Sequence, residues 1–141
     1  MRTQPQDIIA RLEADNSKLA KQAILKEAME EGLDEFFEGV RMALDPLVTF
    51  GVKKVPERSD VLTGQGLSWS NFKVLAEQLR NRELTGHAAR DAIELAMGVA
   101  TTEQWNGFYR RVLIKDLRCG MSEKTVNKVA KEFTQYAVPV F

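Results

Sequence analysis

Residues 110–129 combine the residue types and spacing that can bind an anion. The stretch predicts a helix, a tight turn at Gly120 and a second helix that begins under a Ser122 cap. A helix start presents unpaired backbone N–H groups and the positive end of the helix dipole, so it is a favourable anion site. Between Arg110 and Lys131 the chain has seven basic and two acidic residues. A cationic helix start beside a glycine, which lets another backbone come close, indicates contact with phosphate groups.

Lysines form a stripe on the last predicted helix, which runs from Ser122 to about Gln135. At about 100° per residue, Lys124, Lys128 and Lys131 lie within roughly 60° of one another, opposite the apolar residues. Most such stripes are simply solvated. A cation in the first turn opposes the helix dipole, however, so Lys124 favours a functional interpretation. The residues expected to contact phosphate in this region are Lys115, Arg118, Gly120, Ser122, Lys124, Thr125 and Lys128.

An earlier turn in the chain, at residues 84–90, also combines a threonine, a glycine and a helix start with a basic residue. Its candidate phosphate contacts are Thr85, Gly86, His87 and Arg90. Two such turns can hold two phosphates at a fixed spacing, although glycine before a helix is common in any helical bundle. Lys53 and Lys54 are a third candidate contact, for which a solvated loop is the ordinary explanation.

The sequence does not support catalysis or metal binding by this chain. His87 is the only histidine and Cys119 the only cysteine, so no Cys/His metal cluster is present. Phosphate-binding glycine loops of nucleotide-binding proteins and catalytic triads are also absent. We therefore expect no catalytic residue, no metal site and no cofactor in this chain.

Acidic and basic residues are unevenly distributed along the chain, although the net charge is zero. The formal net charge of the 141 residues is zero, with 44% apolar and 28% charged residues, which suits one domain with one core. Residues 1–45 carry six basic and ten acidic side chains, whereas residues 110–141 carry seven basic and three acidic. Separate acidic and basic blocks are typical of a protein that approaches a polyanion in a fixed orientation.

Cysteine content and hydropathy indicate the compartment. A single cysteine excludes an intramolecular disulfide and is typical of a reducing environment. The longest nearly apolar run, residues 92–100, contains Glu94 and is too short to cross a bilayer. The first residues begin no signal-type apolar segment. We expect a cytoplasmic monomer with no membrane partner.

Apolar residues at three- and four-residue spacing predict helices along nearly the whole chain. The expected fold is all-α, a compact bundle of about six to seven short helices. The predicted helices cover residues 7–14, 18–31, 34–44, 71–82, 87–99, 102–113 and 122–135. Caps are expected at Ser17, Ser70 and Thr101, and Gln104 completes a capping box with Thr101. Residues 45–69 contain several glycines and prolines and are expected to form one irregular loop segment.

Three motifs carry a resemblance to a known family. The segments TFGVKKVP (49–56), RELTGHAA (82–89) and RVLIKDLRCGMS (111–122) resemble, in the same order, the N-terminal DNA-binding domain of ATP-dependent DNA ligases of the T-even phage type. The likeness spans about residues 17–133. The Leu-Arg-x-Gly turn also resembles one in the larger DNA-binding domains of cellular ATP-dependent ligases.

The resemblance implies an all-helical domain that binds nicked duplex DNA across the minor groove, mostly through phosphates and without sequence specificity. It implies residues 1–136 as the DNA-binding domain and residues 137–141 as the start of a linker to a nucleotidyltransferase domain. The catalytic domains of such a ligase would be its partners, ATP and Mg²⁺ their cofactors, and a bacterial host cell the compartment if a phage encodes it. The family's Lys-x-Asp-Gly motif is absent here, so this chain is expected to bind DNA but not to seal it.

A different class of function is also compatible with the sequence. In that alternative, the acidic N-terminal half makes the chain a helical protein-interaction module for a basic partner. Salt-dependent DNA binding by this chain would distinguish the two.

Overall fold

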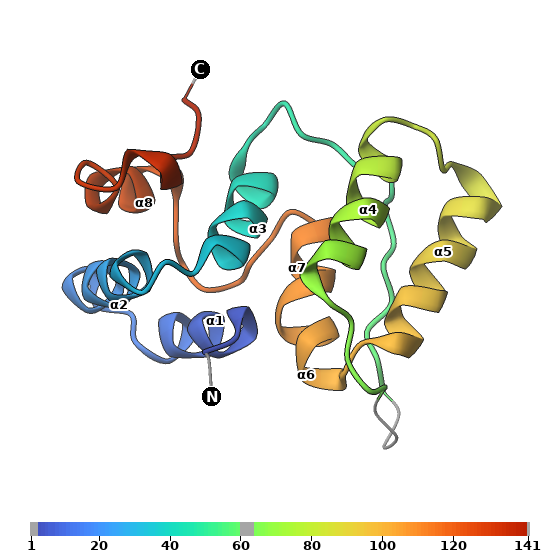
Figure 1. Ribbon diagram of the computed structural model, residues 1–141, viewed down its shortest axis with the longest axis horizontal. Coiled ribbons are helices and arrows are strands. Elements are labelled where there is room, and N and C mark those ends of the chain that lie inside the picture. Colours follow the sequence, from blue (N-terminus) through green and yellow to red (C-terminus); the bar gives the residue numbers. More distant parts are fainter. Residues whose placement is uncertain (1–2, 60–63, 141) are drawn as a thin grey trace.

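The computed structural model describes residues 3–59 and 64–140, and every regular element within them is a helix (Figure 1). The α-helices are α1 (Pro5–Ala14), α2 (Lys18–Glu30), α3 (Asp34–Leu44), α4 (Trp69–Arg80), α5 (Gly86–Val99), α6 (Thr102–Gln104), α7 (Arg110–Leu113) and α8 (Glu123–Val129). A π-helical turn, η1 (Trp105–Tyr109), joins α6 to α7, and a 3₁₀ turn, η2 (Thr134–Tyr136), follows α8. Because α6, η1 and α7 form one continuous segment, the predicted all-α bundle of about six to seven short helices is confirmed.

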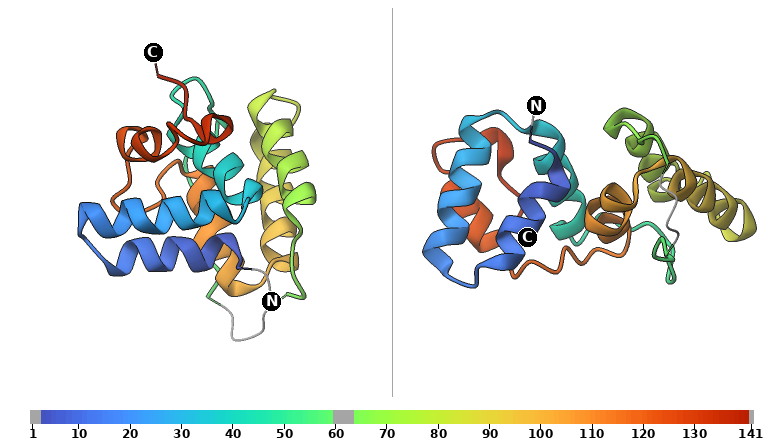
Figure 2. Two further views of the ribbon diagram at one scale, coloured as in Figure 1. Left: turned by 60° about the vertical axis from the view of Figure 1, so that its left-hand side comes forward. Right: turned by 90° about the horizontal axis from the view of Figure 1, so that it is seen from below.

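The helices form two groups along the longest axis of the molecule. In Figure 1, α1, α2 and α8 lie at one end, while α4 and α5 run antiparallel at the other. Helix α3 and the continuous segment from α6 to α7 lie between these groups, and the turned views in Figure 2 show the same order. No helix among the described residues has both the length and the apolar character needed to cross a membrane.

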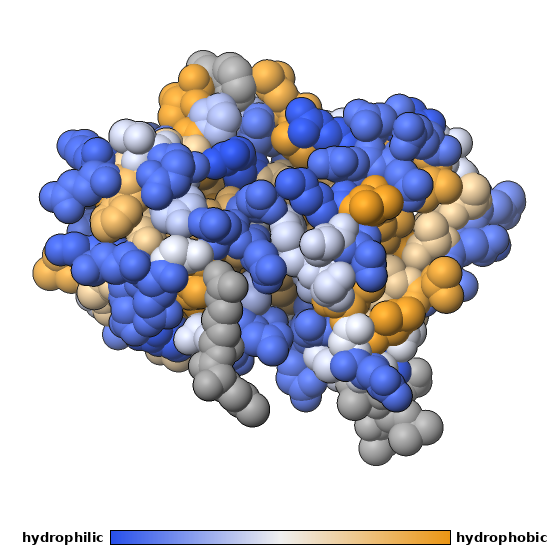
Figure 3. All heavy atoms as spheres, in the orientation of Figure 1, coloured by the Kyte–Doolittle hydropathy of each residue, from blue (hydrophilic) through white to orange (hydrophobic). Residues whose placement is uncertain are grey.

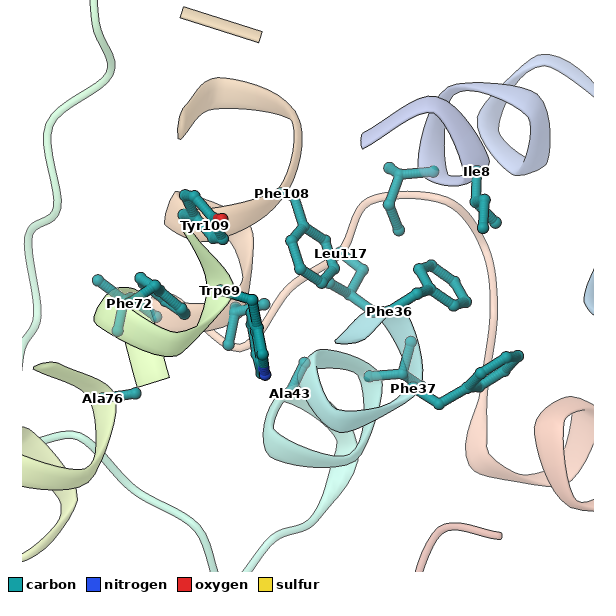
Figure 4. Close-up of a cluster of buried hydrophobic side chains, with 14 of the residues drawn as sticks. Ile8, Phe36, Phe37, Ala43, Trp69, Phe72, Ala76, Phe108, Tyr109 and Leu117 are labelled. Atoms are coloured by element: carbon teal, nitrogen blue, oxygen red, sulfur yellow. The ribbon is translucent and has the colours of Figure 1, made fainter. Parts of the chain in front are cut away.

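Aromatic side chains from α3, η1 and α4 pack together in the middle of the molecule (Figure 4). Phe108, from the π turn, lies 6.1 Å from Phe36 of α3 and 6.0 Å from Trp69 of α4, measured between ring centroids. Gly39 of α3 allows this approach, because a Cβ atom there would lie 2.3 Å from Cζ of Phe108. The π turn therefore holds the central ring of the core, within a segment predicted as one continuous helix.

The predicted helix starts all lie within two residues of the observed ones, and α1 and α4 each begin two residues earlier than expected. Ser17 caps α2 and Thr101 caps α6, where Thr101 and Gln104 form the expected capping box with two hydrogen bonds of 3.0 Å. Helix α4, however, begins under Ser68 and not Ser70, since the Ser68 hydroxyl accepts a hydrogen bond from the backbone N–H of Asn71. The earlier start buries Trp69, which an N-cap at Ser70 would have left outside the helix.

The last predicted helix is much shorter than expected. It ends at Val129 and not near Gln135, because Tyr136 is buried by stacking on Phe37 with ring centroids 4.5 Å apart. The Tyr136 hydroxyl also donates to the carboxylate of Asp34. These contacts draw the chain away from the axis of α8.

The fold continues past the expected domain end at residue 136. Val138 is only 3% exposed. Its N–H donates to Oδ1 of Asn127 at 2.7 Å, and its carbonyl accepts from Nδ2 of the same side chain at 3.0 Å. The packed part of the chain therefore includes Val138.

Residues 45–68 contain no helix or strand in their described part, as expected; residues 60–63 lie outside the described residues. Basic side chains from elsewhere hold this segment by its backbone carbonyls. Arg110 donates to the carbonyl of Val55 at 2.7 Å, and Arg82 donates to the carbonyl of Thr49 at 3.3 Å. The segment is thus attached to both α7 and the end of α4.

Candidate nucleic-acid interface

The connection between α4 and α5 presents a group of free backbone amides. The N–H groups of Thr85, Gly86, His87 and Ala88 donate to no other described residue, and all four residues are exposed. The Thr85 side chain makes no capping hydrogen bond, and the first turn of α5 holds no acidic residue. Gly86 has φ +55°, a conformation that favours glycine. The positive end of a 14-residue helix is therefore open to an anion.

Arg82 positions this turn against the irregular segment. Its Nη2 donates to Oγ1 of Thr49 at 3.0 Å. Gly51 has φ +69°, and a Cβ atom there would lie 2.8 Å from Nη1 of Arg82. The predicted contacts Lys53 and Lys54 are exposed and follow this junction directly. The structure thus brings the first two motifs together, through an arginine that was not among the predicted site residues.

The second predicted turn leads into α8. Arg118, at φ +55°, is exposed and lies 3.7 Å from the carboxylate of Asp116, measured from Nε. Gly120 is also exposed and has φ +68°. Ser122 caps α8 as predicted, because its hydroxyl accepts from the N–H of Thr125 at 3.4 Å. The N–H groups at the first two positions of α8, where Lys124 lies, bond no other described residue.

The buried side chain of Lys21 lies next to the Gly120 turn. Lys21 is 6% exposed, and its Nζ donates to the carbonyls of Leu12 at 2.6 Å and Asp15 at 2.7 Å, at the end of α1. A Cβ atom at Gly120 would lie 3.4 Å from Cε of Lys21. A signal for this role exists in the sequence, since Lys21 falls in the same helical stripe as the buried residues at 25, 28 and 29 of α2.

Lys115 has a structural role that sequence reasoning did not foresee. Its Nζ donates to the carbonyls of Met42 and Asp45, each at 2.7 Å, at the end of α3. Burial lowers the pKa of this ammonium group below its usual value. Lys115 therefore stabilises the negative end of α3, and it does not join the exposed side chains of the second turn.

The basic excess of residues 110–131 is partly internal. Arg110 and Arg111, like Lys115, donate to backbone carbonyls, and their side chains are 15% and 17% exposed. The basic side chains of this region that remain exposed are Arg118, Lys124, Lys128 and Lys131. Lys131 lies beyond the end of α8, so the predicted helical stripe consists of Lys124 and Lys128.

The two turns lie at opposite ends of the molecule. In Figure 1 the start of α5 lies at one end of the long axis and α8 at the other. A single phosphate group therefore cannot contact both, and an elongated polyanion would have to span the domain. Figure 3 shows mainly hydrophilic residues on this face, with apolar residues gathered over α4 and α5.

Comparison with solved structures finds that the chain is similar to two proteins named Pmar-Lig_PreS3 and Pmar-Lig_Pre. The sequence identity to each is 61%, the TM-scores are 0.95 and 0.96, and 99% of this chain is covered. The chain spans only 32% of the length of either protein. Both names point to a ligase-related domain. No protein-family model and no curated protein matches the chain.

Proposed function

We propose that this chain is the DNA-binding domain of an ATP-dependent DNA ligase and binds nicked duplex DNA through its phosphates. The observation that carries the proposal is the 61% identity, over 99% of the chain, to proteins with ligase-related names. The free amides of α5 and the exposed cations beside α8 supply the chemistry that such binding needs.

In this proposal each turn binds phosphates by a different means. The start of α5 offers four backbone N–H groups, aided by His87 and Arg90. The second turn offers Arg118, Lys124 and Lys128, positioned by the Gly120 turn and the Ser122 cap. Neither set selects a base, because backbone contacts carry no sequence information. Minor-groove binding across the duplex follows the family resemblance of the three motifs.

The chemistry of nick sealing belongs to other domains of the parent protein. A Lys-x-Asp-Gly motif is absent from this chain, and the chain spans 32% of the similar proteins. ATP, Mg²⁺ and the nucleotidyltransferase domain are therefore assigned to the remainder of a ligase of the T-even phage type. Incubating this chain with labelled ATP and Mg²⁺ is expected to yield no labelled band on a denaturing gel, and a labelled band would refute this division of labour.

The decisive experiment is a fluorescence anisotropy titration with labelled nicked duplex. Lys124→Ala is expected to weaken binding by about two- to threefold at moderate salt, because one phosphate contact is lost. Lys18→Ala is the matched control, since Lys18 is also an exposed lysine at the start of a helix. The absence of DNA binding at low salt would refute the proposal and favour the protein-interaction alternative that uses the acidic N-terminal half.

A further inference from the structure

A groove runs between α2 and the chain that follows α8, away from the free amides of α5. Its volume is about 430 Å³. Apolar side chains from both sides line it, namely Leu19 and Ala23 of α2 and Val129 and Phe133 beside the end of α8. The groove is therefore an apolar surface between two packed elements.

Leu19 is a large apolar residue of this groove that is open to solvent. Leu19 is 77% exposed, whereas Leu25 of the same helix is fully buried. Phe133 is only partly buried on the opposite wall. Adjacent apolar side chains left open to water favour contact with another apolar group, since burying a leucine side chain releases free energy.

The rim of the groove is basic. Lys26, Lys128 and Lys131 line it, and none of their ammonium groups bonds or pairs with another described residue. Glu132 is the one acidic side chain among the lining residues. An occupant with negative charge around an apolar side chain matches this arrangement.

We propose that this groove binds an acidic peptide segment of a partner protein, with a large apolar side chain placed against Leu19 and Phe133. The lysines would pair with its carboxylates. Duplex DNA is a poorer fit, because its outer surface is phosphate and sugar and offers no large apolar group for Leu19. The groove shares Lys128 with the DNA-binding proposal, but that proposal requires neither Leu19 nor Lys26.

The test selects random displayed peptides on the immobilised 141-residue chain and measures the affinity of the recovered peptides. Recovered peptides are expected to be acidic and to contain large apolar residues. Leu19→Ser is expected to weaken their binding by about tenfold, and Lys26→Glu by about fivefold. The matched controls are Leu95→Ser, an equally exposed leucine on α5, and Lys18→Glu on α2, and both should bind as the unaltered chain does.

Several outcomes would overturn the proposal. Recovery of no peptide, or of peptides that bind Leu19→Ser and Leu95→Ser equally, would show that the groove is not a docking site. Peptides without acidic residues would refute the role of the lysines. If Leu19→Ser instead weakened duplex DNA binding, the groove would belong to the DNA interface. Because the substituted residues are exposed, melting curves should coincide and exclude unfolding as the cause.

Discussion

Among single residues, many basic side chains of this protein bind backbone carbonyls at the ends of helices. Lys21 does so at α1 and Lys115 at α3, while Arg58 donates to carbonyls at the end of α5 at 2.6–3.0 Å. The last carbonyls of a helix lack hydrogen-bond partners and carry partial negative charge. A basic side chain there supplies both a hydrogen-bond donor and a compensating positive charge. Counting charges along the chain therefore overstates the positive charge available to a ligand.

Gly120 should be the site in the second turn that tolerates substitution least. Gly120→Val places a β-branched side chain at φ +68° over Lys21, and the left-handed conformation costs about 1–2 kcal/mol. We expect the melting temperature to fall by about 3–8 °C, with weaker DNA binding. Lys124→Ala is the companion variant and should lower affinity without changing the melting temperature. Unchanged melting of Gly120→Val would contradict the strain assigned to this turn.

Cys119 should make stability depend on alkaline pH. Burial raises the pKa of its thiol above the ordinary value of 9.0. A group whose pKa is raised by folding stabilises the folded state below the unfolded pKa, and this contribution is lost as pH rises toward the folded pKa. The stability difference between the unaltered chain and Cys119→Ala should therefore shrink as the pH rises above the ordinary thiol value of 9.0.

Lys115 also has a shifted pKa, but it does not affect the difference between the unaltered chain and Cys119→Ala. Its lowered pKa works in the opposite direction, but both proteins contain it, so its effect cancels in the difference. Denaturant melts at several pH values measure this difference. A difference that stays constant across the range would show that the thiol is not held neutral by burial.

Among the helices, the start of α5 contrasts with the other capped starts. Ser17, Ser68, Thr101 and Ser122 each accept a hydrogen bond from a backbone N–H of the helix that follows, whereas Thr85 does not. The capping-box position three residues after Thr85 is occupied by Ala88, which has no polar side chain to contribute. The amides stay open at a cost in helix stability, which is consistent with the proposed phosphate contact.

Completing the box should therefore stabilise the helix and weaken DNA binding. Ala88→Glu adds a carboxylate at the positive end of α5, worth about 0.3–1 kcal/mol of stability, and repels phosphate. Ala88→Gln is the matched control, because it can complete the box without a charge. We expect a raised melting temperature for both, with a larger loss of DNA affinity for Ala88→Glu. Unchanged affinity in both variants would show that the start of α5 does not contact DNA.

Across the molecule as a whole, the separation of the two turns would make the proposed DNA binding the sum of distant phosphate contacts. Duplex affinity should be roughly micromolar and fall steeply with salt. Arg118→Ala and Lys124→Ala should each reduce the salt slope by about one counterion, equally on A·T-rich and G·C-rich nicked duplexes. Salt titrations by anisotropy measure both quantities. A variant that loses affinity for one sequence and keeps it for the other would identify that residue as a base contact.

The helices and most of their starts are predictable from the amino-acid sequence. Local rules act within a few residues, so the capping box at Thr101, the Ser122 cap and the irregular segment after Asp45 all follow from neighbouring residues. The glycine turns are predictable for the same reason, since Gly86 and Gly120 occupy left-handed conformations. The resemblance to a ligase domain likewise rests on three short motifs, each contained in a few consecutive residues.

Packing between distant segments determines which charges remain available and where elements stop. Lys115 binds carbonyls at the end of α3, about seventy residues earlier in the chain, so its environment depends on packing and not on neighbouring residues. The early end of α8 likewise follows from Tyr136 packing against Phe37, about a hundred residues away along the chain. Side-chain burial is a property of the assembled core, and a pattern of neighbouring residues cannot contain it.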